Sequence, residues 1–84
     1  MTVRYTASEM VTIKVCHKSS GEAASGKRIV LGIDGLFTGG MTDTKWTDSA
    51  GEAEFDIKPS KGRIFVDGHS VYEGRLSGRK TVYI

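Results

Sequence analysis

The sequence contains a single cysteine, Cys16, and only two histidines, His17 and His69. One cysteine cannot form an internal disulfide, and the zinc sites that stabilise small domains need several Cys or His residues at close spacing. The chain also lacks the closely spaced aspartates and glycine of a calcium-binding loop. We therefore expect no metal or other cofactor, and a fold that is stabilised by the packing of apolar side chains alone.

Long apolar runs and a strong excess of one charge are missing as well. Residues 1–9 include Arg4 and Glu9 and have no continuous apolar stretch, so they are typical neither of a secretory signal nor of a membrane anchor. The default expectation is a cytoplasmic protein without a membrane partner. The 12 basic and 10 acidic residues give a net charge of +2, far below the balance of a dedicated nucleic-acid binder.

Helical periodicity is absent too, because the apolar residues alternate with polar ones at period two between glycine-containing turns. This pattern predicts strands at residues 11–17, 27–34, 42–47, 52–57, 63–67, 70–76 and 79–84. Short connections without a helical crossover favour antiparallel pairing in two packed sheets. The predicted fold is all-β, a seven-stranded antiparallel β-sandwich of Ig-like or prealbumin-like type. Residues 11–84 form its single domain, and residues 1–10 are an N-terminal extension or edge segment.

Three connections have recognisable turn chemistry. Asp67-Gly68 is the strongest hairpin signal, because glycine accepts the positive φ that a two-residue turn requires. The segment Thr47-Asp48-Ser49-Ala50-Gly51 predicts a second hairpin, which links Trp46 to the alternating strand at residues 52–57. Pro59-Ser60-Lys61-Gly62 predicts a turn before the strand at residues 63–67.

The order of these features resembles transthyretin-like (prealbumin-like) modules, which include carboxypeptidase regulatory-like domains and the Cna B-type repeats of surface proteins. Residues 19–26 look like the small G-x-P-x-x-G loop of that group, with Ala24 where the group often has proline. Thr47-Asp48-Ser49-Ala50-Gly51 is similar to its T-D-x-x-G turn, with Phe55 as the buried aromatic that follows. Residues 58–66 are similar to its P-x-G-x-Y-x-V segment, with Phe65 near the usual aromatic.

The resemblance implies a β-sandwich without catalytic residues in this chain. The enzymes of the fold, the hydroxyisourate hydrolases, end in Tyr-Arg-Gly-Ser, whereas this chain ends in Val82-Tyr83-Ile84. Cna B-type repeats depend on a bond between lysine and asparagine, and this sequence contains no asparagine. The chain therefore departs from both specialised branches.

Few residues are arranged for chemistry. Cys16 and His17 are neighbours in a predicted strand, so their side chains point to opposite faces and cannot act together as nucleophile and base. A free structural cysteine and, at His69, an exposed turn histidine are the simpler interpretations. We expect the protein not to be an enzyme.

Candidate binding residues lie in a glycine-rich segment at residues 34–42. Leu36, Phe37 and Met41 are large and apolar, so this loop either folds back over the open end of the sandwich or presents them to a protein partner. Trp46 is expected in the core, with an exposed binding anchor as the alternative. An edge strand, the last one included, offers a second route to a protein partner or to another copy of the chain.

We therefore expect a non-catalytic protein-interaction or structural accessory module, which binds through the apolar loop, an edge strand or both. The alternative function is nucleic-acid or polyanion binding through the basic C-terminal strands, with Arg63, Arg75, Arg79 and Lys80 facing phosphates. Nucleic acid is the less favoured partner, because basic side chains on strands also serve to block edge-to-edge aggregation.

Overall fold

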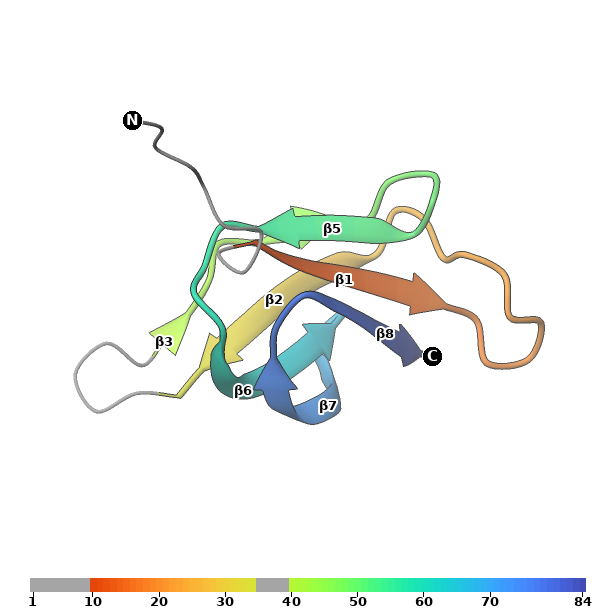
Figure 1. Ribbon diagram of the computed structural model, residues 1–84. Helices are drawn as coiled ribbons and strands as arrows, with labels where there is room; N and C mark the ends of the chain where they lie inside the picture. The colour runs from red at the N-terminus through yellow and green to blue at the C-terminus, as the bar shows by residue number, and fades with distance from the viewer. Residues whose placement is uncertain (1–9, 35–39) are drawn as a thin grey trace, which may run out of the picture.

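The computed structural model describes residues 10–34 and 40–84 and consists of strands, turns and loops, with no helix in that part of the chain. Figure 1 shows how these strands are arranged. Their bounds are β1 Val11–Cys16, β2 Arg28–Ile33, β3 Gly40–Met41, β4 Lys45–Trp46, β5 Glu52–Phe55, β6 Ser60–Val66, β7 His69–Leu76 and β8 Arg79–Tyr83.

The strands form two sheets, as expected of a β-sandwich-like, all-β protein. One sheet has three strands in the order β5-β1-β8. The other has five: β3, β2, β6 and β7 follow one another, and β4 pairs with β2 beside β3. The short strands β3 and β4 therefore share one edge of β2, where they pair with its two ends.

The number and bounds of the strands differ from the expectation. The structure has eight strands in its described residues. The strand expected at residues 42–47 is shortened to β4, and an additional short strand, β3, lies in the segment that was expected to be a loop. The turn predicted at residues 59–62 is also wrong in part, since β6 already begins at Ser60, opposite Leu76. A glycine at position 62 permits this pairing, because a Cβ there would collide with the carbonyl oxygen of Gly32 on the neighbouring strand.

The expectation of purely antiparallel pairing is wrong for β8. This strand runs parallel to β1, with Thr12 opposite Arg79 and Cys16 opposite Tyr83. The arrows of β1 and β8 point the same way in Figure 1, whereas β5 runs in the opposite direction. The turn at residues 77–78 carries the chain from the five-stranded sheet to the three-stranded one, so β8 is aligned by the sheet that it joins and not by β7.

The turn between β6 and β7 is the hairpin that the sequence predicts. Asp67 and Gly68 both have positive φ, 51° and 86°, as a two-residue primed turn requires. The segment at residues 47–51 is instead a corner between sheets, because β4 pairs with β2 and β5 pairs with β1. Asp48 stabilises this corner, since its Oδ1 accepts hydrogen bonds from the N–H groups of Ala50 and Glu52 at 2.9 and 3.0 Å.

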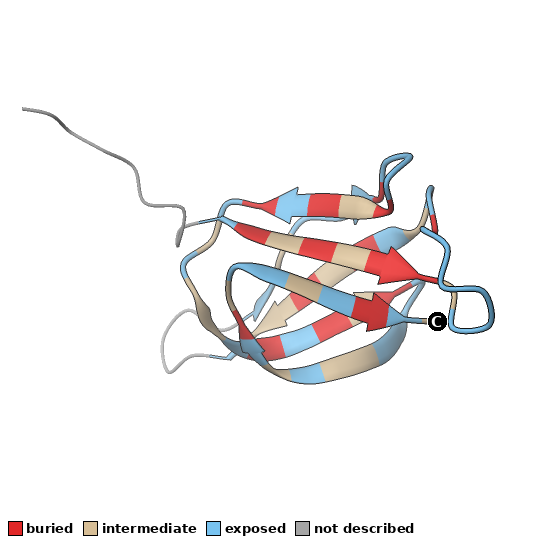
Figure 2. Ribbon diagram, turned by 45° about the vertical axis from the view of Figure 1, so that its right-hand side comes forward, coloured by how far each residue is buried: buried red, intermediate tan, exposed pale blue. Residues whose placement is uncertain are grey.

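The core lies between the two sheets. Every second residue of β1 is buried there, and β2, β5 and β6 contribute in the same alternating way, which Figure 2 shows as bands along the strands. Phe55 is the largest of the fully buried side chains and is 2% exposed, as the sequence predicts for the aromatic after the corner. The other buried apolar residues are Val11, Ile13, Val15, Cys16, Ala24, Ile29, Leu31, Ala53, Ile64, Val66, Leu76 and Val82.

Candidate interaction surfaces

The first candidate surface is the outer edge of β8. The backbone of β8 bonds to β1 through alternate residues: Gly78 accepts a hydrogen bond from the Thr12 N–H at 2.8 Å, and the Ile84 N–H donates to Cys16 at 2.9 Å. Successive residues of a strand direct their backbone groups to opposite sides. The N–H and C=O groups of Arg79, Thr81 and Tyr83 are therefore directed away from β1, and none of the described residues pairs with them.

The side chains along this edge differ in their surroundings. Arg79 forms an ion pair with Glu52 across β1, on the outside of the three-stranded sheet. Lys80 points to the core side, where its Nζ lies 4.8 Å from the centre of the Tyr72 ring. Thr81 and Tyr83 are exposed, so the middle and the end of the edge are accessible to another chain.

The apolar loop is described only in part. Leu36 and Phe37 lie outside the described residues. Met41 is in β3, pairs with Gly32 of β2 and is 62% exposed. This sequence-predicted binding residue is thus on the surface of the five-stranded sheet.

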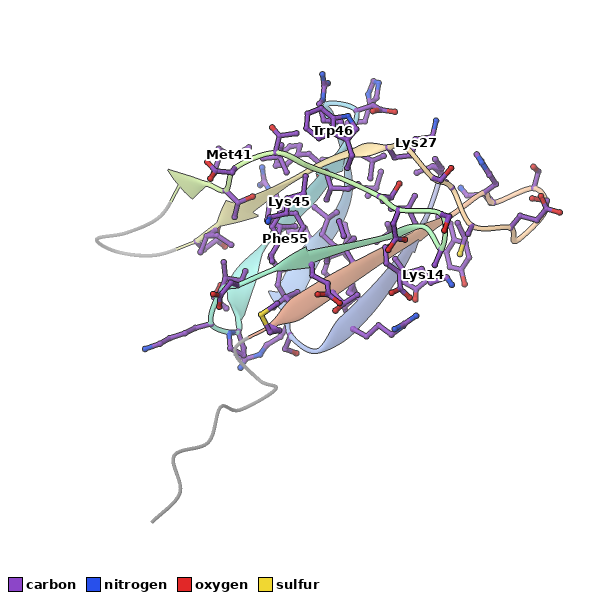
Figure 3. All side chains as sticks on the ribbon, turned by 90° about the horizontal axis from the view of Figure 1, so that it is seen from above. Lys14, Lys27, Met41, Lys45, Trp46 and Phe55 are labelled. Atoms are coloured by element: carbon purple, nitrogen blue, oxygen red, sulfur yellow. The ribbon has the colours of Figure 1, made fainter. Side chains whose placement is uncertain are left out.

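Trp46 is 60% exposed, so the expectation that it packs in the core is wrong. It lies opposite Arg28 on β2, and its side chain shares the face of Arg28 and not that of the buried Ile29. In Figure 3, Met41 and Trp46 lie on the opposite side of the molecule from β1. The sequence could not reveal this, because β4 is too short for its own alternation to indicate which face is buried.

The second candidate surface is the outer face of the five-stranded sheet, the face turned away from the core. Sequence reasoning missed it as a unit, because its residues come from separate strands and only their register aligns them. A hollow of about 440 Å³ on this face is lined by both apolar and basic residues: Arg28, Val30, Met41, Thr44, Phe65 and Gly68.

The basic residues that the sequence suggested for polyanion binding are divided between the sheets. Arg63 and Arg75 are exposed on the outer face of the five-stranded sheet, and Arg63 lies 3.5 Å from a carboxylate oxygen of Glu73. Arg79 and Lys80 belong to β8 in the other sheet, where Arg79 is also paired with an acid. The structure therefore brings these four residues together only in pairs.

The cysteine and the two histidines differ in their surroundings. Cys16 is buried and free, and it faces Tyr83 of β8. His17 follows β1 and donates its backbone N–H to Glu22, while His69 is exposed at the start of β7. Within residues 10–34 and 40–84, no group of three His, Cys, Asp or Glu side chains is placed to hold a metal ion.

Comparisons of the chain with models of known families, with curated proteins and with solved structures find no match. In the part of the chain that the structure describes, no helix is long and apolar enough to cross a bilayer.

Proposed function

We propose that this protein is a non-catalytic protein-interaction module that binds a polypeptide by adding a strand to the outer edge of β8. The observation that carries the proposal is the outward direction of the backbone N–H and C=O groups of Arg79, Thr81 and Tyr83. An edge of this kind binds extended chains through main-chain hydrogen bonds, while the exposed side chains beside it add selectivity.

The same edge is self-complementary. A second copy can approach antiparallel, so that Thr81 of one copy lies opposite Thr81 of the other. Arg79 of each copy then lies opposite Tyr83 of the other copy. All of these residues have their backbone groups directed outward, so each facing pair can exchange two hydrogen bonds. The arginine beside the tyrosine ring adds a favourable cation–π contact. Self-association is therefore the first form of the proposed activity to test.

The type of sandwich is part of the proposal. The corner at residues 47–51 and the buried Phe55 support a transthyretin-like module, a group that the sequence resembles. The edge strand and the exposed Met41 support a binding role for such a module.

The test compares Thr81→Pro with Thr81→Val. Proline removes the outward N–H of residue 81, whereas the bonds between β8 and β1 come from its neighbours Lys80 and Val82 and remain. Valine has a similar size and a strand preference and keeps the N–H, so it is the matched control. Circular dichroism establishes that both variants are folded before binding is measured.

Sedimentation velocity over a range of concentrations measures self-association, and capture from a lysate of the native host compares partners across the same variants. We expect association to be kept in Thr81→Val and lost in Thr81→Pro, with little dependence on salt. Association that is unchanged in Thr81→Pro contradicts the proposal. Release of bound nucleic acid by high salt would favour the alternative, polyanion binding through Arg63, Arg75, Arg79 and Lys80, because phosphate contacts release counterions.

A further inference from the structure

We infer that the outer face of the five-stranded sheet is a second, separate binding surface, which fits an acidic polypeptide segment that carries apolar side chains. This inference goes beyond the edge of β8, because β8 belongs to the other sheet. Its evidence is the composition of the face, the way its apolar side chains meet, and the charges around them.

The apolar part of the face is formed by residues that the sheet register aligns. Val30 of β2 lies opposite Phe65 of β6, and Gly32 lies opposite Met41. Trp46 is at the other end of the β2 edge, opposite Arg28. The core of the protein is on the opposite side of this sheet, so these side chains are not needed to fill it.

Gly32 lets two of these side chains meet. A Cβ built at Gly32 would lie 3.2 Å from Cε1 of Phe65 and 3.4 Å from Sδ of Met41. The two side chains therefore approach the glycine from the strands on either side of β2 and cover it. Together with Val30 they form one apolar cluster, beside the hollow of about 440 Å³. Exposed apolar clusters with a polar rim are typical of protein contact sites.

Met41 and Trp46 are the most accessible of the large apolar side chains on the face, at 62% and 60% exposure. Both types are enriched at protein interfaces, because methionine adapts to irregular surfaces and tryptophan offers a large contact area. None of the described residues covers either side chain. A partner that packs on Met41 and Trp46 would bury apolar area that the folded chain leaves in water.

The rim of the face is mostly basic. The register brings Arg28, Lys61, Arg63 and Arg75 to this side, against Glu73 and, just after β2, Asp34. Glu73 is already engaged with Arg63. Lys27 and Asp67, at the hairpin end, lie 3.9 Å apart and balance each other. A net positive rim attracts a partner with carboxylates and disfavours a basic one.

A polypeptide fits this face better than a single-stranded nucleic acid. Bases need flat, open aromatic rings at regular spacing, with free cations along the backbone. On this face the aromatic rings are those of Trp46 and the partly buried Phe65, and Met41 lies beside Phe65 over Gly32. Among the cations, Arg63 is already paired with Glu73. A polypeptide could place apolar side chains on the apolar cluster and neighbouring carboxylates beside the basic rim.

The experiment uses a synthetic peptide in which glutamate and leucine alternate, with a peptide of alternating lysine and leucine as its control. Each is titrated into the isotopically labelled full chain, and backbone amide NMR shifts locate the binding. We expect the acidic peptide to shift resonances of β2, β3, β4 and β6 on the outer face. The basic peptide should bind much more weakly.

Two sets of variants test the named residues. Met41→Ser combined with Trp46→Ser should weaken binding at least about ten-fold, the loss expected when interface anchors are removed. Met10→Ser is the control, because Met10 is an exposed apolar residue (38%) that precedes β1 of the other sheet. Arg75→Glu should also weaken binding, whereas Lys18→Glu, in an exposed loop, should leave the affinity unchanged.

Several results would overturn the inference: shifts confined to the three-stranded sheet, equal binding of both peptides, or unchanged affinity in the double serine variant. Stronger binding of an oligothymidylate probe to this face than of the acidic peptide would also overturn it. The Thr81→Pro variant distinguishes this inference from the proposed function, because loss of the β8 edge should leave peptide binding to the outer face intact.

Discussion

The hydroxyl of Thr47 donates a hydrogen bond of 2.6 Å to the backbone carbonyl of Ala24. The same oxygen accepts one from the backbone N–H of Lys27 at 2.9 Å. Thr47 is the one buried polar residue among those that the structure describes, at 5% exposure. It connects the corner before β5 to the loop before β2, so a single hydroxyl satisfies backbone groups of two segments that are distant in sequence.

Replacing Thr47 with valine should destabilise the protein by about 1–3 kcal/mol, because the shape is retained while the carbonyl of Ala24 and the N–H of Lys27 lose their partner. Urea denaturation measures this change. Thr44→Val is the control, since Thr44 is exposed. The free energy of unfolding of this variant should stay close to that of the natural chain. Equal stability of the two variants would contradict the role of the Thr47 hydroxyl.

Alanine substitutions at Gly51 and Gly21 distinguish the cost of backbone strain from the cost of a steric clash. Both glycines have positive φ, 76° and 78°, but a Cβ at Gly51 would lie 2.7 Å from the carbonyl oxygen of Val15, whereas one at Gly21 would meet nothing within 4 Å. Gly21→Ala should cost about 1–2 kcal/mol from the left-handed conformation alone. Gly51→Ala should cost about 1–3 kcal/mol more. Thermal melts compare the two variants, and a similar loss in both would show that the corner relaxes.

The parallel register of β1 and β8 can be tested by a disulfide. Cys16 faces Tyr83 across these strands, so in Tyr83→Cys the two thiols are neighbours, and mild oxidation should join them within one molecule. Arg79→Cys is the control, because Arg79 faces Thr12, at the other end of the two strands from Cys16. Intact mass under non-reducing conditions should show the loss of two hydrogens in the first variant only. Intermolecular dimers from both variants would contradict the register.

The two phenylalanines Phe55 and Phe65 should respond differently to truncation. Phe55→Ala should cost about 3–5 kcal/mol, because Phe55 is 2% exposed and its removal leaves a cavity between the sheets. Phe65→Ala should cost less, since Phe65 is partly exposed on the outer face. Urea denaturation measures both. A larger loss at Phe65 would show that the outer face is covered in the folded protein.

Local patterns in the sequence were sufficient for much of the fold. The alternation of Val11, Ile13 and Val15 predicts a half-buried strand, and the structure buries all of them. Asp67-Gly68 predicts its hairpin, because the geometry of a two-residue turn depends on the positive φ angles of those two residues alone. Strand alternation and tight turns are properties of neighbouring residues, so they can be read without knowledge of the partner strand.

Residues that depend on distant partners were predicted less well. Trp46 was expected in the core, but its face is set by pairing with Arg28, eighteen positions earlier in the printed sequence. Ser60 was expected in a turn, but it pairs with Leu76. The candidate residues Arg63, Arg75, Arg79 and Lys80 are close in sequence, yet the passage of the chain from one sheet to the other divides them.

Side-chain period and backbone preference are enough to predict that the chain forms strands, where its tightest hairpin lies, and that alternating residues such as Val11, Ile13 and Val15 are buried. The folded chain was needed to show that β8 runs parallel to β1 with an outward backbone edge, and that Met41, Trp46, Val30 and Phe65 share one face. Register and sheet membership arise from packing between distant segments, and the candidate binding surfaces depend on both.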